Sequence, residues 1–303
     1  KENLEKLLRE KVMFQDKEEC FYIYKQIMGD HIQTGIVAAA SVDDYINDVI
    51  KKHENTREDK EIERAMHIDT IDANTGCVFL TYRKRSDINE IVENVVREAK
   101  PDYDFTDELN VHHIFYVLND KKVINSIVKI FAKIDTLYVA DGHHRSAAAT
   151  RIALKRRKKE KSKSNKFEYD YFLSVIFPDD EMMIMDYNRV VKDLNGLTKE
   201  KFLKELEKKF KIEKIKIMQK PVKIHSFTMY IDGEWYTIRA NDEIIDRRDF
   251  IKSLDVSILQ ENVLDPLLGI KNPRTDKRIN FIGGIRGIEE LKKLVDSKEY
   301  KVA

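Results

Sequence analysis

The spacing of hydrophobic positions changes several times along the chain, and each change predicts a different kind of element. Apolar residues recur at helical spacing over residues 4–12, which predicts a helix near the start. Further helices are expected over residues 88–99 and 123–132 and from His143 onward. Short apolar runs that favour strands fall at residues 20–24, 35–40, 77–82, 111–118 and 137–140. This alternation predicts an α+β, or mixed α/β, domain rather than a helical bundle.

The segment after Ser41 is expected to be helical for most of its length. Ser41 begins a sequence that is typical of a helix N-terminus, with acidic residues in the first turn. Residues 45–52, and the charged residues that follow through Arg64, are expected to continue as helix. His53 and Arg57 would then share one helix face, because residues four apart lie above one another.

The clearest break in composition is the basic run at residues 155–166. It predicts a solvated helix end that runs into a mobile linker, with a nucleic-acid contact as the alternative. We therefore expect one domain over residues 1–160 and a second over residues 167–303. The second is expected to be an α+β unit with an antiparallel hairpin at Asp232-Gly233. Strands are expected at residues 169–177, 182–187, 223–231, 234–240 and 279–282, and helices at residues 199–210 and 256–264.

Composition narrows the class of protein further. The chain has 303 residues, 42% of them hydrophobic and 36% charged, which is typical of a globular protein with one large core or two smaller ones. Its 55 basic and 54 acidic residues leave a net charge of +1, so DNA is a disfavoured partner. Cys20 and Cys77 lie among apolar or aromatic residues, which predicts reduced core thiols. No apolar run approaches the roughly 20 residues that span a bilayer, so we expect a cytoplasmic protein without a membrane partner.

Polar chemistry is concentrated in Asp141-Gly-His-His-Arg145, where a short β-prone run meets a run of strong helix formers. A helix that begins here leaves several backbone N–H groups unpaired beside the guanidinium, which outlines an anion site. Asp141 can hold a metal ion or act as a base, and either histidine can transfer a proton near neutral pH. The alternative is that Asp141 only caps the helix, Gly142 only makes the turn, and the other side chains cover the first turn.

A second candidate segment is His53-Glu-Asn-Thr-Arg57. If this segment reaches Asp141 in space, Glu54 can take a proton from a hydroxyl substrate while Arg57 steadies a phosphate. The alternative is a solvated helix face. The segment is not the zincin motif, because the second histidine of that motif is missing.

Other polar residues are weaker candidates. His112-His113 alternates faces of an apolar strand, so one ring is expected in the core. Ala73-Asn-Thr-Gly76 is expected to form a turn whose amide and hydroxyl can line a site. Asn188-Arg189 and Arg278 can contribute phosphate or carboxylate contacts from the second domain. Gly283-Gly284 lacks the spacing of the known phosphate-binding glycine loops.

The sequence Ala140-Asp-Gly-His-His-Arg145 resembles a box of the uncharacterised prokaryotic family often labelled ParB-like, domain of unknown function 1015. The resemblance covers nearly the whole chain, and it extends to the residues around His53, Ala73, Asn188 and Arg278. The pattern of that family begins before Lys1 and continues past Ala303, so a longer protein is expected.

The same box is similar to the second box of the ParB and sulfiredoxin-like superfamily. The resemblance implies a ParB/sulfiredoxin-like fold for the first domain and a nucleotide phosphate bound at the start of a helix. Members of the superfamily include a free-serine kinase, a peroxiredoxin-repair enzyme and nucleotide-switched DNA clamps. The resemblance therefore indicates nucleotide phosphate more firmly than any one reaction.

The first hypothesis is a nucleotide-dependent phosphotransferase that uses Mg²⁺, held by Asp141, and takes ATP, ADP or CTP with a small hydroxyl compound. Phosphoryl transfer requires mainly positioning and charge compensation from the protein. One alternative is a nucleotide-binding switch or DNA-associated module without catalysis, and the other is a metal-dependent hydrolase. The expected site residues are Asp141, His143, His144, Glu54 and His53 for catalysis, and Gly142, Arg145, Ser146, Arg57, Asn188, Arg189 and Arg278 for phosphate.

Overall fold

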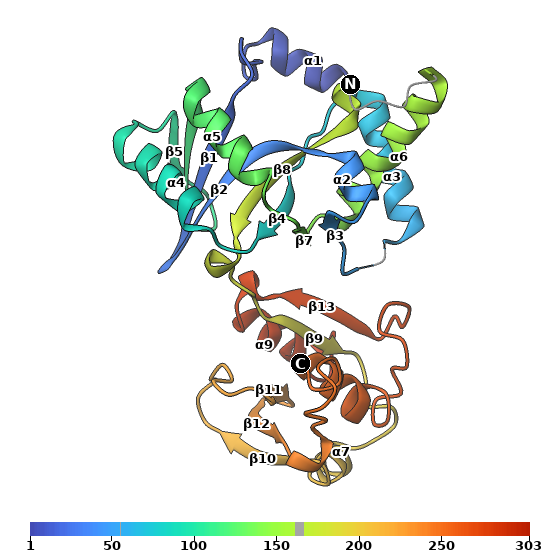
Figure 1. The fold of residues 1–303 in the computed structure, drawn as a ribbon. Helices are drawn as coiled ribbons and strands as arrows, with labels where there is room; N and C mark the ends of the chain where they lie inside the picture. The colour runs from blue at the N-terminus through green and yellow to red at the C-terminus, as the bar shows by residue number, and fades with distance from the viewer. Residues whose placement is uncertain (55, 161–166) are drawn as a thin grey trace. The chain divides into compact units, whose positions relative to one another are not determined.

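The computed structural model describes residues 1–54, 56–160 and 167–303. The chain divides into two compact units, Lys1–Met183 and Ile184–Ala303, and each combines helices with sheets (Figure 1). The expected α+β class is therefore confirmed.

The first unit is built on an eight-stranded mixed sheet in the order β3-β7-β4-β8-β2-β1-β6-β5. The β3/β7 and β4/β8 pairs are parallel and the other pairs are antiparallel. The strands are β1 (Phe21–Met28), β2 (His31–Ser41), β3 (Ile50–Lys51), β4 (Val78–Tyr82), β5 (Tyr103–Thr106), β6 (Val111–Leu118), β7 (Leu137–Asp141) and β8 (Tyr171–Pro178).

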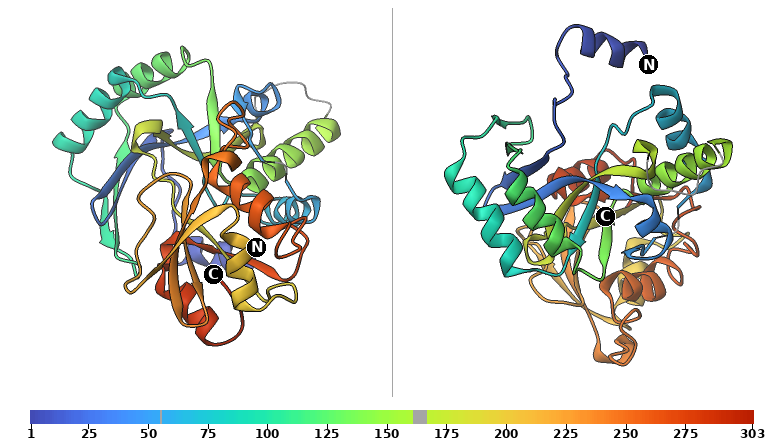
Figure 2. Two further views of the ribbon diagram at one scale, coloured as in Figure 1. Left: turned by 90° about the horizontal axis from the view of Figure 1, so that it is seen from below. Right: turned by 45° about the horizontal axis from the view of Figure 1, so that its top comes forward.

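Helices pack on this sheet in two groups. α4 lies beside α5, and α3 lies beside α6, as the views in Figures 1 and 2 agree. The helices of this unit are α1 (Glu2–Arg9), α2 (Val42–Ile46), α3 (Glu58–Ile71), α4 (Ser86–Glu98), α5 (Lys121–Phe131) and α6 (His143–Glu160). The core between sheet and helices includes Ile23, Leu80, Ile88, Ile127 and Phe172, which are all almost completely buried. Val139 of β7 and Ala149 of α6 belong to the same core, so apolar burial holds the strand and the helix on either side of the candidate box.

The second unit has a three-stranded antiparallel sheet, β10-β12-β11, and a two-stranded pair, β13-β9. The predicted hairpin at Asp232-Gly233 is confirmed, because β11 ends at Ile231, β12 begins at Glu234 and both turn residues have positive φ. Its elements are β9 (Tyr187–Val191), α7 (Lys199–Leu206), β10 (Phe210–Ile215), β11 (Ser226–Ile231), β12 (Glu234–Ala240), α8 (Asp255–Leu259), a π-helical turn (Gln260–Leu264), β13 (Ile279–Gly283) and α9 (Glu289–Asp296).

The predicted helix over residues 45–64 is wrong in its middle. α2 ends at Ile46, and Asp48 has a φ of +56°, which is incompatible with a continuing right-handed helix. Ile50 then enters β3, is almost completely buried and pairs with Leu137. Long-range pairing with β7 therefore overrides the helical pattern. Consequently His53 and Arg57 do not share a helix face, and α3 starts only at Glu58; Asn55 lies outside the described residues.

Boundaries in the second half also differ from expectation. Residues 182–186 are not a strand, because β9 begins only at Tyr187 and Ile184 is 94% exposed. α7 ends at Leu206 and Phe210 starts a strand, since the buried Phe210 packs into the sheet core. β11 begins at Ser226 rather than at residue 223.

The basic run at residues 155–166 does not coincide with the division between the units. Its first residues, through Glu160, continue α6, and its predicted linker residues 161–166 lie outside the described residues. β8 follows the run and pairs with β2 and β4 in the first sheet. The first unit therefore continues through Met183. Among the described residues, no helix is long and apolar enough to cross a membrane.

A buried ion pair joins the end of α6 to the start of β8. Arg157 donates to the carboxylate of Asp170, which is fully buried, and it also donates to Asp43 at 2.6 Å. We expect Asp170→Ala to lower the free energy of unfolding by about 2–3 kcal/mol, because the mutation removes the buried carboxylate partner of Arg157 and leaves the guanidinium with Asp43 alone. Urea unfolding followed by circular dichroism measures this loss.

The matched control is Lys155→Ala on the same helix, which removes an exposed ion pair with Asp69. This variant should lose no more than about 1 kcal/mol. Equal losses in the two variants would contradict a special role for the buried pair.

Candidate functional site

The candidate box is a sharp turn between β7 and α6. Gly142 has a φ of +96°, which L residues with a side chain rarely adopt. Its carbonyl accepts hydrogen bonds from the backbone N–H groups of Arg145 and Ser146, at 2.9 and 3.0 Å. Within the described residues, the backbone N–H groups of His143 and His144 have no acceptor. The first turn of an 18-residue helix therefore offers two free donors.

The guanidinium of Arg145 holds this turn in place. It donates to the carbonyl of Cys77, next to β4, and to the carboxylate of Asp141 at the end of β7. A Cβ at Gly142 would lie 3.1 Å from the Arg145 Nε, and Gly76 also borders the side chain. Arg145 thus fixes the turn, while the side chain of Asp141 remains 73% exposed.

Ser146 serves the same turn and is fully buried. Its hydroxyl donates to the carbonyl of His143 at 3.1 Å and lies 3.3 Å from that of Gly142. Ser146 does not line the cavity beside the box. The structure therefore gives its hydroxyl a role inside the helix start.

His143 lies under the turn beside the segment that contains Glu54. Its side chain is 5% exposed, its Nδ1 is 3.8 Å from the Glu54 carboxylate, and its ring contacts His53 edge-on at 4.4 Å. The Nε2 atom has no hydrogen-bond partner among the described residues. Burial, together with the nearby His53, lowers the pKa of His143 although Glu54 and Asp141 oppose this shift. The result is a neutral imidazole next to a carboxylate, a pair that can move a proton.

His144 faces the other side of the helix start. Its Nε2 accepts a hydrogen bond from the backbone N–H of Arg57 at 3.1 Å, so the N-terminus of α3 is attached to the box. The Arg57 guanidinium pairs instead with Asp59, at 2.8 and 3.2 Å, and does not line the cavity. The sequence hypothesis that Arg57 steadies a phosphate therefore has no support from its position.

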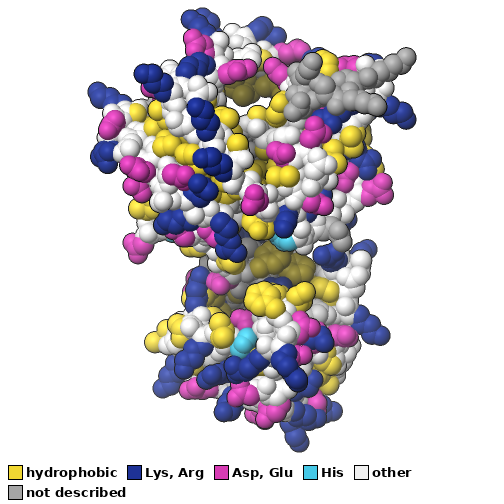
Figure 3. Space-filling model, in the orientation of Figure 1, with side chains coloured by type: hydrophobic (Ala, Val, Ile, Leu, Met, Phe, Trp, Pro, Cys, Tyr) yellow, Lys and Arg dark blue, Asp and Glu magenta, His cyan; other side chains and the backbone are white. Residues whose placement is uncertain are grey.

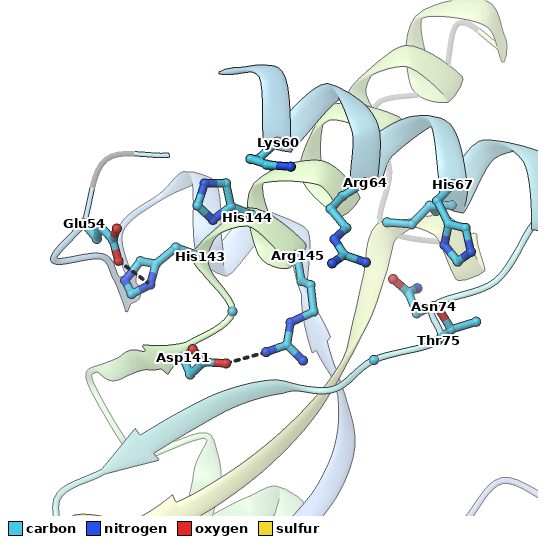
Figure 4. Close-up of a pocket in the computed structure, with 13 residues that line it drawn as sticks. Glu54, Lys60, Arg64, His67, Asn74, Thr75, Asp141, His143, His144 and Arg145 are labelled. Atoms are coloured by element: carbon cyan, nitrogen blue, oxygen red, sulfur yellow. Dashed lines mark hydrogen bonds and ion pairs between the residues drawn. The ribbon is translucent and has the colours of Figure 1, made fainter. Parts of the chain in front are cut away.

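A cavity of about 440 Å³ opens beside the box (Figure 4). One wall is the turn with Asp141, and another is the loop Asn74-Thr-Gly76. The third wall is α3, which contributes two basic side chains and a histidine that the sequence analysis did not single out. These residues are Lys60, Arg64 and His67. A signal was present, because their spacing of four and three residues puts them on one face of a helix.

The two basic side chains on this face of α3 differ in whether they already have an acidic partner. Lys60 pairs with Glu63 at 3.1 Å, whereas Arg64 has no ion pair or hydrogen bond within the described residues. Figure 4 shows the Arg64 guanidinium between Arg145 and the side chains of Asn74 and Thr75. A free guanidinium next to amide and hydroxyl groups is suited to binding an anion.

The residues nominated in the second unit have different surroundings. The Arg278 guanidinium contacts Asp276 at 2.8 Å, Asp193 at 3.3 Å and the carbonyls of Leu268 and Gly269. The Arg278 guanidinium therefore already donates its hydrogen bonds to groups of its own unit. Asn188 and Arg189 lie in β9, and the part of all three residues in a phosphate site stays a prediction.

Comparison with known proteins gives one result. A family model described as "Protein of unknown function (DUF1015)" matches residues 1–257. No curated protein and no solved structure matches the chain. The resemblance to the family of unknown function is confirmed, and the relation to ParB and sulfiredoxin stays a prediction.

The lowered pKa of His143 gives a pH dependence with a defined sign. Because the unfolded chain, with an ordinary histidine pKa of about 6.5, binds this proton more readily than the folded chain, protonation favours unfolding. With respect to His143, the free energy of unfolding is therefore highest above about pH 6.5 and decreases as the pH falls below that value. We expect His143→Asn, which retains a polar atom near Nδ1, to lose less stability than the wild type between pH 7.5 and pH 5.5.

Urea unfolding of both proteins at the two pH values measures this difference. The other seven histidines are common to both proteins, so their effects cancel in the comparison. An identical pH dependence would show that burial of His143 does not depress its protonation.

Proposed function

This chain belongs to the family of proteins of unknown function DUF1015, and we propose that it is a nucleotide-dependent phosphotransferase. The observation that carries the proposal is the cavity beside the box. Among the described residues, the same 440 Å³ cavity is lined by His143 and His144, whose backbone N–H groups are free, and by Arg64, whose guanidinium is unpaired. Helix N-termini and guanidinium groups both favour phosphate. The volume suits a small molecule of nucleotide size.

The proposed phosphate site consists of the N–H groups of His143 and His144 with Arg64 and Lys60. ATP, ADP or CTP supplies the phosphate. Arg145 shapes the turn through its bonds to Cys77 and Asp141. Phosphoryl transfer in such a site depends on positioning and charge compensation.

The proposed base is the Glu54–His143 pair. Its atoms are 3.8 Å apart, and burial keeps the imidazole neutral. A carboxylate beside a neutral imidazole can accept the proton of an attacking hydroxyl group. His53, in ring contact with His143, orients that ring. The acceptor is a small hydroxyl compound.

A Mg²⁺ ion fits this site only together with the nucleotide. Such ions take one or two carboxylates from the protein and the remaining ligands from phosphates and water, and Asp141 is an exposed carboxylate at the cavity. Bound there, the ion would neutralise phosphate charge. No group of three His, Cys, Asp or Glu side chains in the described ranges could hold a metal ion by itself, which counts against the metal-dependent hydrolase.

A nucleotide-binding switch without catalysis would use the same phosphate site. Its DNA-associated form requires a basic surface. Acidic and basic side chains are interspersed over the face seen in Figure 3, and the net charge is +1. The phosphotransferase is therefore better supported than the DNA-associated form, and the transfer assay distinguishes it from a switch without catalysis.

The first test measures nucleotide binding. Thermal unfolding of the chain with ATP, ADP, CTP and GTP, with and without Mg²⁺, should show stabilisation by at least one nucleotide. Arg64→Gln should weaken the binding about tenfold to a hundredfold, because a charge-assisted hydrogen bond to phosphate is lost. Titration calorimetry gives the affinity.

Arg83→Gln is the matched control, since Arg83 is an exposed arginine of the same unit that pairs with Asp179 outside the cavity. Its affinity should equal that of the wild type. If no nucleotide binds, or if both variants bind equally well, the cavity is not a nucleotide site.

The second test concerns the base. Glu54→Gln should retain nucleotide binding but slow transfer to the preferred acceptor about 100-fold to 10,000-fold, because the proton acceptor is lost while the shape is kept. Release of ADP in the presence of a panel of small hydroxyl compounds measures the rate. Undiminished transfer in Glu54→Gln would contradict the assigned role, and loss of binding would indicate a role in positioning.

A further inference from the structure

The second unit contains a cavity of its own. Its volume is about 530 Å³, and all of its walls come from residues 186–303. Most of the lining is apolar and includes the side chains of Phe202, Trp235, Leu259 and Leu264. Small-molecule sites have about 300–1,000 Å³ and are lined mainly by such side chains. This cavity is therefore large enough for the apolar body of a small ligand.

One guanidinium group borders the apolar lining. Arg189 lies in β9, and its guanidinium carbon is 5.5 Å from the ring centre of Tyr187 and 5.4 Å from that of Phe281. The two rings stack on each other at 5.1 Å. Cation–π contacts with both rings fix the direction of the guanidinium.

Most hydrogen-bond donors of Arg189 are still available. Its Nη1 donates to the carbonyl of Tyr187, and no carboxylate of the described residues pairs with it. Burial lowers the pKa of Arg189, as expected for a cation without a compensating anion. Because a guanidinium has five N–H donors, several remain for a ligand.

The other charged side chains that line this cavity are either ion-paired or hydrogen-bonded within the unit, or exposed to solvent. Lys220 pairs with Asp186 at 2.8 Å, and Asp255 contacts Nδ1 of His225 at 3.0 Å. Lys223 is exposed to solvent. Among the described residues that line the cavity, Arg189 is thus the cation that lies against aromatic rings without a carboxylate partner. One such guanidinium matches a ligand with a single negative charge.

We propose that this cavity binds a small organic acid, with the carboxylate on Arg189 and the apolar body against Trp235 and its neighbours. A planar carboxylate accepts two parallel N–H bonds from a guanidinium. A phosphate monoester carries more charge, which the apolar walls would have to desolvate. Its lining shares no residue with the cavity beside the box in the first unit.

The experiment uses Trp235, which is the only tryptophan of the chain and is 9% exposed. Its fluorescence is followed while phenylacetate or hexanoate is titrated into the full chain. The neutral amides of both acids, and phenyl phosphate, are titrated in parallel. Both acids should give a saturable change, and each amide should bind about tenfold more weakly or worse, because a charge-assisted bond is lost.

Arg189→Gln should abolish the preference for acid over amide. The matched control is Arg239→Gln, an exposed arginine on β12 that does not line the cavity, and it should bind like the wild type. Val256→Phe narrows the cavity at a half-exposed wall position and should weaken acid and amide together. If Arg189→Gln does not fold, Val256→Phe tests the position of the ligand by itself.

Several outcomes would overturn the proposal. These are the absence of a saturable response to either acid, equal affinity for acid and amide, unchanged affinity in Val256→Phe, and tighter binding of phenyl phosphate than of phenylacetate. Loss of nucleotide binding in Arg189→Gln with unchanged acid binding would also assign this arginine to a different ligand.

Discussion

The geometry of the candidate site depends on one guanidinium group. Arg145 bonds to the carbonyl of Cys77 and to the carboxylate of Asp141, so it joins the approach to β4, the end of β7 and the first turn of α6. Gly142 and Gly76 have no side chain where this guanidinium passes. The interaction holds the chain in a turn whose φ of +96° would otherwise be one of several accessible conformations. Because the turn is fixed, the free N–H groups at the start of α6 have a defined direction.

The two adjacent histidines of the box have different surroundings and therefore different chemistry. His143 is 5% exposed and lies beside Glu54, whereas His144 uses its Nε2 to hold the backbone of Arg57. The two histidines are neighbours in sequence but contact different segments, because consecutive helical residues point about 100° apart. One is therefore available for proton transfer next to a carboxylate, and the other attaches α3 to the turn.

The two proposed ligand sites differ in the surroundings of the cation that would bind the anion. At the box, Arg64 borders polar side chains and helix N–H groups, an environment that tolerates a highly charged phosphate. In the second unit, Arg189 lies between two aromatic rings beside an apolar lining. A low-polarity environment strengthens a single charge pair but makes additional charge costly. The expected ligands differ for this reason.

The sequence by itself determined the features that local physics controls. The strand, glycine and helix formers around Gly142 predicted the turn, and Asp232-Gly233 predicted the hairpin, because both depend on the backbone preferences of a few residues. Only the tertiary structure decided how distant segments meet. Ile50 pairs with Leu137 and removes the helix expected around His53, and packing of α3 on α6 brings Arg64 to the box. Ser146, a phosphate candidate by position, is buried in the helix start. These outcomes depend on the burial of apolar side chains far apart in the chain, which no local pattern encodes.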